Sequence, residues 1–205
     1  FNSLFANSES FESVPAGLFA NNPEVDSFRM LFSGTSLKSV PAGLFANNHK
    51  VTNFQSAFSK TAIQSVPADL FAGCGKVTTF MSCFTGCSEL QSVPAELFKS
   101  SGAFTTVTKT AFNNIFKDCT SLTEVPAGLF DGFTLVTAFN DAFNGCASLT
   151  TLPAGLFATN TAVTSFTNVF KDCTSLKSIP EGVLGGLSKV TSFSGLFAGC
   201  TGLEE

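Results

Sequence analysis

The chain has 205 residues, a net charge of −4 and 25 phenylalanines, but neither tryptophan nor tyrosine. No cluster of lysine and arginine follows one face, so we expect no nucleic-acid partner. No apolar run approaches the ~20 residues that cross a bilayer, so we expect no membrane insertion in this segment.

One phrase of about 27 residues recurs seven times, and its clearest anchor is S-V-P-A-G-L-F. A fixed period of this length is typical of a solenoid, in which each unit buries its apolar face against its neighbours. The sequence therefore predicts a single solenoid over 1–205, and we expect a monomer. The aligned prolines are Pro15, Pro41, Pro67, Pro94, Pro126, Pro153 and Pro180.

The two ends of the chain lie inside repeats. Residues 1–8 copy the end of later units, and residues 201–205 begin another. Solenoids need atypical capping repeats to cover their end cores, and neither end has that character. We therefore expect a fragment of a longer protein.

The first half of each unit, S-L-x-S-V, is short and β-branched and ends on a proline. The residue before a proline favours extended geometry, so Val40 and Val66 suit the end of a strand. Proline then fits the first turn of a helix or 3₁₀ turn through A-G-L-F.

The second half, V-T-x-F-x-x-x-F, predicts a short helix. Val163, Phe166, Val169 and Phe170 lie at relative positions 0, 3, 6 and 7, which is an apolar stripe at helical spacing. A second extended stretch at V-T-x-F stays open, because four residues do not settle the period. The predicted class is α/β, a leucine-rich-repeat solenoid (horseshoe) in which each repeat has a short strand and short helical segments.

Three phenylalanine columns recur at fixed register and predict the core, because side chains at one register position stack from coil to coil. The first is Phe19, Phe45, Phe71, Phe98, Phe130 and Phe157; the second is Phe1, Phe28, Phe54, Phe80, Phe112, Phe139, Phe166 and Phe193; the third is Phe5, Phe32, Phe58, Phe84, Phe116, Phe143, Phe170 and Phe197.

The fourth unit carries five extra residues between Phe98 and Phe116, which we place around residues 99–106. Insertions in solenoids map to loops on one face. Two interpretations are open, a neutral bulge and a loop that contacts a ligand.

The repeat resembles the BspA-like leucine-rich repeats of bacterial surface proteins of the Bacteroidetes type. The likeness lies in V-T-x-F-x-x-x-F-x-x-C followed by x-S-L-x-x-V, as in 136–146 with Ser148 and Leu149. It covers the whole chain, although V-P-A-G-L-F departs from the family's usual continuation. The resemblance implies a secreted or cell-surface bacterial protein, with adhesion as its role.

Five of the seven cysteines share one column, which earlier units fill with Ser8, Thr35 and Thr61. Small hydroxyl replacements indicate a half-buried turn position, so we expect free thiols, with a disulfide between neighbouring coils as the alternative. No C-x₂-C or Cys/His cluster is present, so we expect no metal site and no cofactor. The column is Cys87, Cys119, Cys146, Cys173 and Cys200.

No catalytic set can be assembled, and we expect no enzyme. The one histidine, His49, lies in a predicted loop and has no partner in sequence. Asp118 and Asp172 sit in K-D-C turns, where a turn or cap role is expected. No known nucleotide-binding or nucleophile motif occurs.

The exposed positions between leucine and valine of S-L-x-S-V give the candidate binding face, because stacked coils align them into a polar stripe. The threonines that follow the valine of V-T-x-F form a second column, which we assign to hydrogen bonding at a helix start. The candidate binding residues are Glu12, Lys38, Gln64, Gln91, Thr123, Glu124, Thr150 and Lys177.

These features predict an extracellular or cell-surface interaction module, an adhesin that binds a protein partner such as a host matrix or surface protein. A glycan-binding surface protein is the alternative, weakened by the absence of the tryptophan and tyrosine on which sugar rings usually stack. A structural spacer without its own ligand is a third interpretation.

Overall fold

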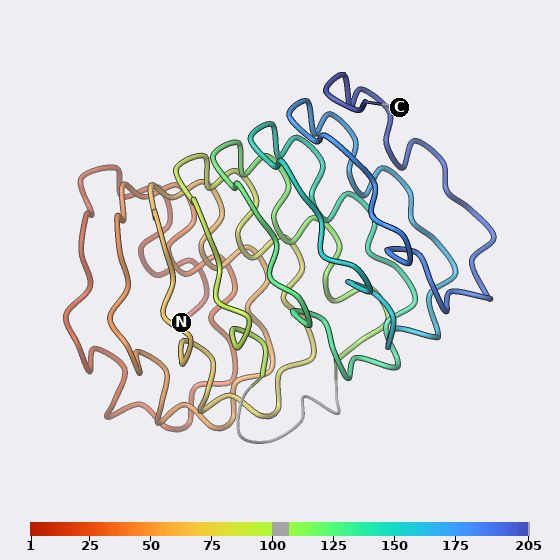
Figure 1. The fold of residues 1–205 in the computed structure, drawn as a ribbon. Coiled ribbons are helices and arrows are strands. Elements are labelled where there is room, and N and C mark those ends of the chain that lie inside the picture. The colour runs from red at the N-terminus through yellow and green to blue at the C-terminus, as the bar shows by residue number, and fades with distance from the viewer. Residues whose placement is uncertain (100–106, 205) are drawn as a thin grey trace.

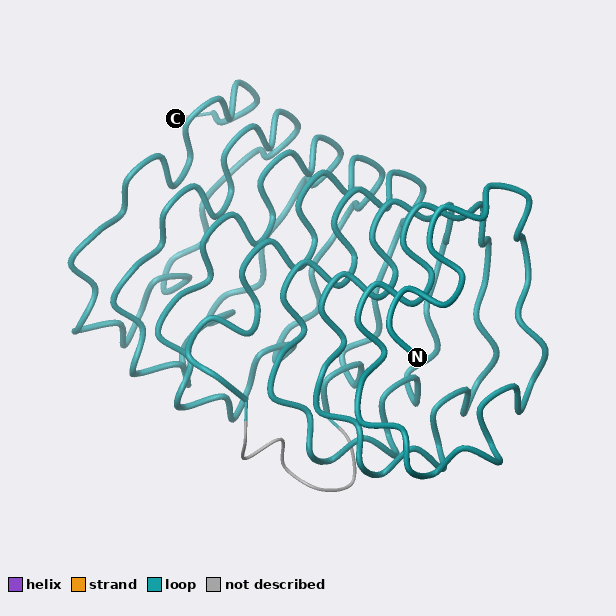
Figure 2. Ribbon diagram, turned by 180° about the vertical axis from the view of Figure 1, so that it is seen from behind, coloured by secondary structure: helices purple, strands orange, loops and turns teal. Residues whose placement is uncertain are grey.

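The computed structural model describes residues 1–99 and 107–204. The chain winds into a stack of coils that lie side by side, with the colour running in order from red at one end to blue at the other (Figure 1). In each coil it rises along one face and returns along the opposite face. Within the described residues there is no helix and no strand longer than an isolated parallel bridge, as the view from behind shows (Figure 2).

The short helices predicted for V-T-x-F-x-x-x-F are therefore wrong, as is the α/β assignment of the repeat. A helix would direct its N–H groups to carbonyls four residues back. Here every second N–H group donates to a carbonyl of the next coil, as those of Phe28, Met30 and Phe32 do at N to O distances of 2.8–2.9 Å. The N–H groups between them close β-turns, such as Leu31 N–H to the Phe28 carbonyl at 3.2 Å.

Left-handed backbone at two positions in each of these segments makes the turns possible. Asn168 has φ of 56° and Asp172 has φ of 58°, a region that asparagine, aspartate and glycine tolerate best. One column of such residues precedes the cysteines, and glycine fills every second place in it. That column is Asn7, Gly34, Lys60, Gly86, Asp118, Gly145, Asp172 and Gly199.

Crowding between coils explains the alternation with glycine. A Cβ added at Gly34 would lie 2.6 Å from Oδ1 of Asn7 in the preceding coil, and one added at Gly145 would meet Oδ1 of Asp118. A side chain in one coil thus lies over the glycine of the next.

The segment S-L-x-S-V does not form the predicted strand, because its backbone contacts with neighbouring coils are sparse, with one isolated bridge among the described residues, at Glu124–Thr151. After it, P-A-G-L forms a β-turn and not the predicted helical turn. The Leu18 N–H donates to the Pro15 carbonyl at 3.3 Å, with Gly17 at φ of 77°. The alternative that the sequence left open, a second extended stretch at V-T-x-F, matches the isolated bridges Ser27–Asn53 and Ser165–Ser192.

The three predicted phenylalanine columns are buried over most of their length, in a core that also contains leucine, valine and cysteine side chains. In the third column, consecutive rings from Phe32 to Phe197 stack with centroids 5.5–5.6 Å apart. Rings of the first and second columns interlock at a steep tilt, as Phe130 and Phe139 do with centroids 4.8 Å apart. The stacking and the burial of these rings contribute to the apolar contact between coils.

The insertion in the fourth unit is absorbed without loss of register. Residues 100–106, where most of it was placed, lie outside the described residues. Part of it is a bulge further on, because Thr108 and Phe112 are four residues apart where Thr78 and Phe80 are two apart. Phe112 still stacks on Phe80, with centroids 5.9 Å apart.

No helix in the described part of the chain is long and apolar enough to cross a membrane.

Replacing Phe139 by alanine should lower the free energy of unfolding by about 3–5 kcal/mol, because the side chain is fully buried and leaves a cavity. Urea denaturation monitored by circular dichroism measures the effect. Phe193→Ala is the matched control in the same column, since Phe193 is 45% exposed and should cost much less. Equal losses in the two variants would contradict the assignment of the column to the core.

Gly145→Ala should also destabilise the fold, by more than Gly132→Ala does. Both glycines have φ near +80°, at 78° and 85°, so each alanine costs about 1 kcal/mol or more of backbone strain. Only the Cβ at position 145 meets a neighbour, Oδ1 of Asp118, whereas nothing lies within 4 Å at position 132. Adding Asp118→Gly to Gly145→Ala should restore part of the loss; no recovery would show that the crowding is unimportant.

Candidate binding face

Seven of the eight predicted residues lie in one column on one face of the coils, which we call the stripe, and Glu124 lies in the column beside it. Each backbone N–H donates to the carbonyl of the stripe residue in the preceding coil, with N to O distances of 3.0–3.3 Å. All eight predicted residues are exposed. The structure therefore brings them together, and their role in binding stays a prediction. The bonded column reads Glu12, Lys38, Gln64, Gln91, Thr123, Thr150, Lys177 and Glu204.

Ion pairs between coils occupy the two ends of this stripe. Lys38 Nζ lies 2.9 Å from Glu12 Oε2, and Lys177 Nζ lies 3.5 Å from Glu204 Oε1. These four side chains are more than half exposed, so each pair contributes little to stability. The positive charges of Lys38 and Lys177 are nevertheless each paired with a glutamate of the same stripe.

The centre of the stripe is mostly uncharged. Gln64 Nε2 donates to Glu89 Oε2 at 3.1 Å, and the Thr123 and Thr150 hydroxyls donate to carbonyls of the preceding coil at 3.3 Å. Among the described residues, Glu124 has neither an ion pair nor a side-chain hydrogen bond.

A second column of exposed groups runs beside the stripe. Its side chains are hydroxyls apart from Glu124, and within the described residues these hydroxyls form no hydrogen bond to the rest of the chain. They are free to bond to water or to a partner. The column reads Ser13, Ser39, Ser65, Ser92, Glu124, Thr151 and Ser178.

On the opposite face, the polar side chains of V-T-x-F-x are largely satisfied inside the chain. Asn53 Oδ1 accepts the Gln55 N–H at 2.8 Å, and Asn140 Oδ1 accepts the Ser165 hydroxyl at 2.9 Å and the Thr167 N–H at 3.2 Å. This face therefore offers less hydrogen-bonding capacity than the stripe.

The threonine column after the valine is structural, although not at a helix start as predicted. The Thr78 N–H and the Thr78 hydroxyl both donate to the Thr52 carbonyl of the preceding coil, at 2.8 and 3.0 Å. Thr164 and Thr191 repeat this arrangement on the carbonyls of Thr137 and Thr164.

The cysteine column lies inside the stack, where all seven thiols are free and buried. Each thiol of the column donates to the carbonyl of a third-column phenylalanine in the preceding coil, with Sγ to O distances of 3.0–3.3 Å. Burial raises the pKa of Cys87 to about 11 and that of Cys173 to about 12. The thiols thus act as small hydrogen-bond donors between coils.

The remaining polar groups do not converge on a reaction centre. His49 Nδ1 donates to the Gly73 carbonyl at 2.9 Å on the surface, and Asp118 and Asp172 occupy left-handed turn positions. No group of three or more histidine, cysteine, aspartate or glutamate side chains in the described ranges could hold a metal ion.

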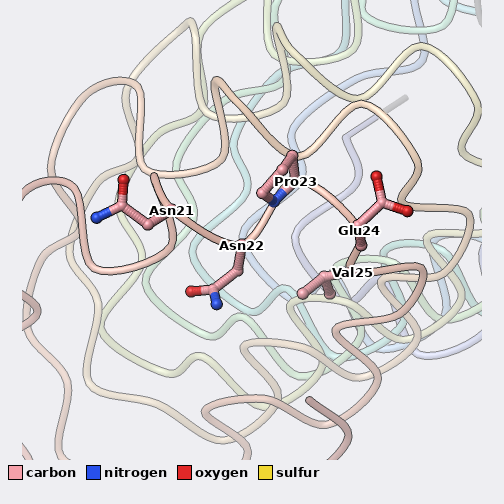
Figure 3. Close-up of a pocket in the computed structure, with 5 residues that line it drawn as sticks. All are labelled: Asn21, Asn22, Pro23, Glu24 and Val25. Carbon is pink, nitrogen blue, oxygen red and sulfur yellow. The ribbon is translucent and has the colours of Figure 1, made fainter.

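One pocket lies at a corner of the first coil and is lined by five consecutive residues, Asn21, Asn22, Pro23, Glu24 and Val25. The amide of Asn22 and the carboxylate of Glu24 point in different directions (Figure 3). Glu24 is also paired with Lys50 of the next coil. The pocket therefore lacks the converging polar groups of a ligand site.

Sequence reasoning missed two partners of the stripe, Glu89 and Glu204. Glu89 precedes Leu90 and so lies outside the two positions that defined the candidate face, whereas Glu204 follows Leu203 at the register position that Lys177 has after Leu176. The sequence signal for these contacts is the spacing of about one repeat, since Glu89 lies 25 residues after Gln64 and Glu204 lies 27 residues after Lys177.

No family model matches the chain. No curated protein matches it either.

Solved structures with a similar arrangement include two described as leucine-rich-repeat proteins. The leucine-rich-repeat domain of the type III effector XopL has 14% identity and a TM-score of 0.46, over 84% of this chain and 62% of that chain. A leucine-rich-repeat protein from Eubacterium ventriosum has 15% identity and a TM-score of 0.36, over 93% and 64%. Toll in a Drosophila Toll–Spätzle complex has 19% identity and a TM-score of 0.46, over 90% and 28%.

This chain spans less than two thirds of the length of each of these structures. All three TM-scores are below 0.5, so the description of the fold rests on the hydrogen-bond ladders and the phenylalanine columns.

The thiols of the folded protein should resist alkylation at pH 8, because burial blocks access and the raised pKa depletes the thiolate that reacts. Labelling with iodoacetamide followed by mass spectrometry tests this. Cys200 is 8% exposed and should react first, whereas Cys119, Cys146 and Cys173 are fully buried. Denaturation in guanidinium should expose all seven. Rapid labelling of the native column, or a loss of stability on adding reductant, would contradict free buried thiols.

Proposed function

We propose that the chain is a non-enzymatic interaction module that binds a protein partner through the stripe face. The single observation that carries the proposal is the contrast between the two faces of each coil. The hydroxyls of the column beside the stripe and the Gln91 amide are exposed and form no hydrogen bond within the described residues, whereas the Asn53 and Asn140 side chains of the opposite face are bonded within the chain. A partner gains new hydrogen bonds on the first face without breaking existing ones.

The same proposal includes an adhesin role at a bacterial cell surface, and membership of the BspA-like repeats. The support is the sequence resemblance and the few charges of the chain. A net charge of −4 also disfavours nucleic acid as the partner.

A glycan ligand is the second candidate, favoured by the row of free hydroxyls beside the stripe. It is weakened by the burial of the aromatic side chains, because the phenylalanines of the described residues lie mainly in the core and offer no exposed ring platform along the stripe.

The test is a binding screen of the purified chain against immobilised matrix and serum proteins, run beside a glycan array. The variant combines Gln64→Ala, Gln91→Ala and Thr150→Ala, all at exposed positions of the central stripe. A protein hit should weaken by about tenfold or more, since a few central residues carry most of an interface's affinity.

The matched control combines Arg29→Ala, Gln55→Ala and Ser194→Ala on the opposite face and should bind as the wild type does. Thermal melting confirms that both triple variants stay folded. Equal binding by the stripe variant and the wild type would refute the proposed face. A hit on glycans alone would support the second candidate, and silence in both screens would favour a spacer.

A further inference from the structure

We infer that the partner is a protein segment that places a lysine or arginine side chain against Glu124, in the column beside the centre of the stripe. This inference rests on the proposed function and deepens it by naming the chemistry of the contact.

The cations of the stripe are already compensated within the chain. Lys38 is paired with Glu12 at one end, and Lys177 with Glu204 at the other. An acidic partner would have to displace these glutamates before it reached either lysine, and it would lose part of the gain in doing so. The ends of the stripe therefore do not favour an anionic partner.

Glu124, beside the centre of the stripe, carries an uncompensated charge. Its carboxylate is exposed and has no ion pair or hydrogen bond within the described residues. Its neighbours along the column, Ser92 and Thr151, are neutral hydroxyl residues, and Thr151 forms a backbone bridge with it. A cation placed here meets one carboxylate flanked by free hydrogen-bonding groups, without competition from a basic side chain.

A second acid, Glu89, contacts the centre of the stripe through Gln64. It accepts a hydrogen bond from neutral Gln64 at 3.1 Å and keeps its charge uncompensated. Phosphate or sulfate groups of a partner would be repelled here, and a neutral sugar would leave the charge unpaired. A basic peptide is the ligand that complements both acids.

The test starts from a phage library of random 15-residue peptides, selected on the immobilised 205-residue chain. Enriched sequences are synthesised and titrated by fluorescence polarisation against the wild type and Glu124→Gln. Glu181→Gln is the matched control, because Glu181 is also exposed and unpaired among the described residues but lies outside the stripe. All titrations are repeated at low and high salt.

We expect the selected peptides to be enriched in lysine or arginine. Glu124→Gln should weaken their binding by about threefold to fivefold, the range of an exposed ion pair, and should reduce the dependence on salt. Glu181→Gln should bind as the wild type does.

Two outcomes separate this inference from the proposed function. Peptides that lose affinity with Gln64→Ala, Gln91→Ala and Thr150→Ala, but bind Glu124→Gln as well as the wild type, would overturn the inference and leave the proposed face intact. Peptides insensitive to the triple variant, or a selection without binders beside a positive glycan array, would overturn both.

Discussion

The structure depends on the sharing of backbone hydrogen bonds between neighbouring coils. In the segment that begins at Phe28, alternate N–H groups donate to the next coil and the others close turns within their own coil. No coil can satisfy its backbone alone, which is the property that makes a solenoid cooperative between neighbours. The ladder also fixes the register, so the phenylalanines of successive coils stack ring on ring.

The ladder also restricts which residues can occupy the surface turns. Two positions in each of these segments need φ near +60°, and the coil spacing brings a side chain of one coil over the backbone of the next. Gly145 and Gly199 meet both demands where Asp118 and Asp172 lie in the preceding coil. The thiols follow the same logic, because a small donor such as Cys146 reaches the Phe116 carbonyl without pushing the coils apart.

The core and the position of the stripe could be predicted from the sequence, whereas the local backbone could not. Val163, Phe166, Val169 and Phe170 are all buried, as a helix would bury them, but a run of turns buries the same positions. Asn168 and Asp172 were the distinguishing signal, since residues of that type recur where the chain is left-handed. The ion pairs of Lys38 and Lys177 depend on side-chain conformations across coils, which periodicity does not determine.

The two faces of a coil differ because the same ladder is dense on one and sparse on the other. Where V-T-x-F-x-x-x-F runs, threonine and asparagine side chains form hydrogen bonds to the backbone, as Thr78 and Asn53 do. Their polar atoms are therefore already bonded within the chain. Where S-L-x-S-V runs, the backbone bonds between coils are fewer, and side chains such as Ser65 and Gln91 form no hydrogen bond within the described residues. The face that contributes least to holding the coils together is thus the one whose side chains are available to a partner, as the proposed contact at Glu124 requires.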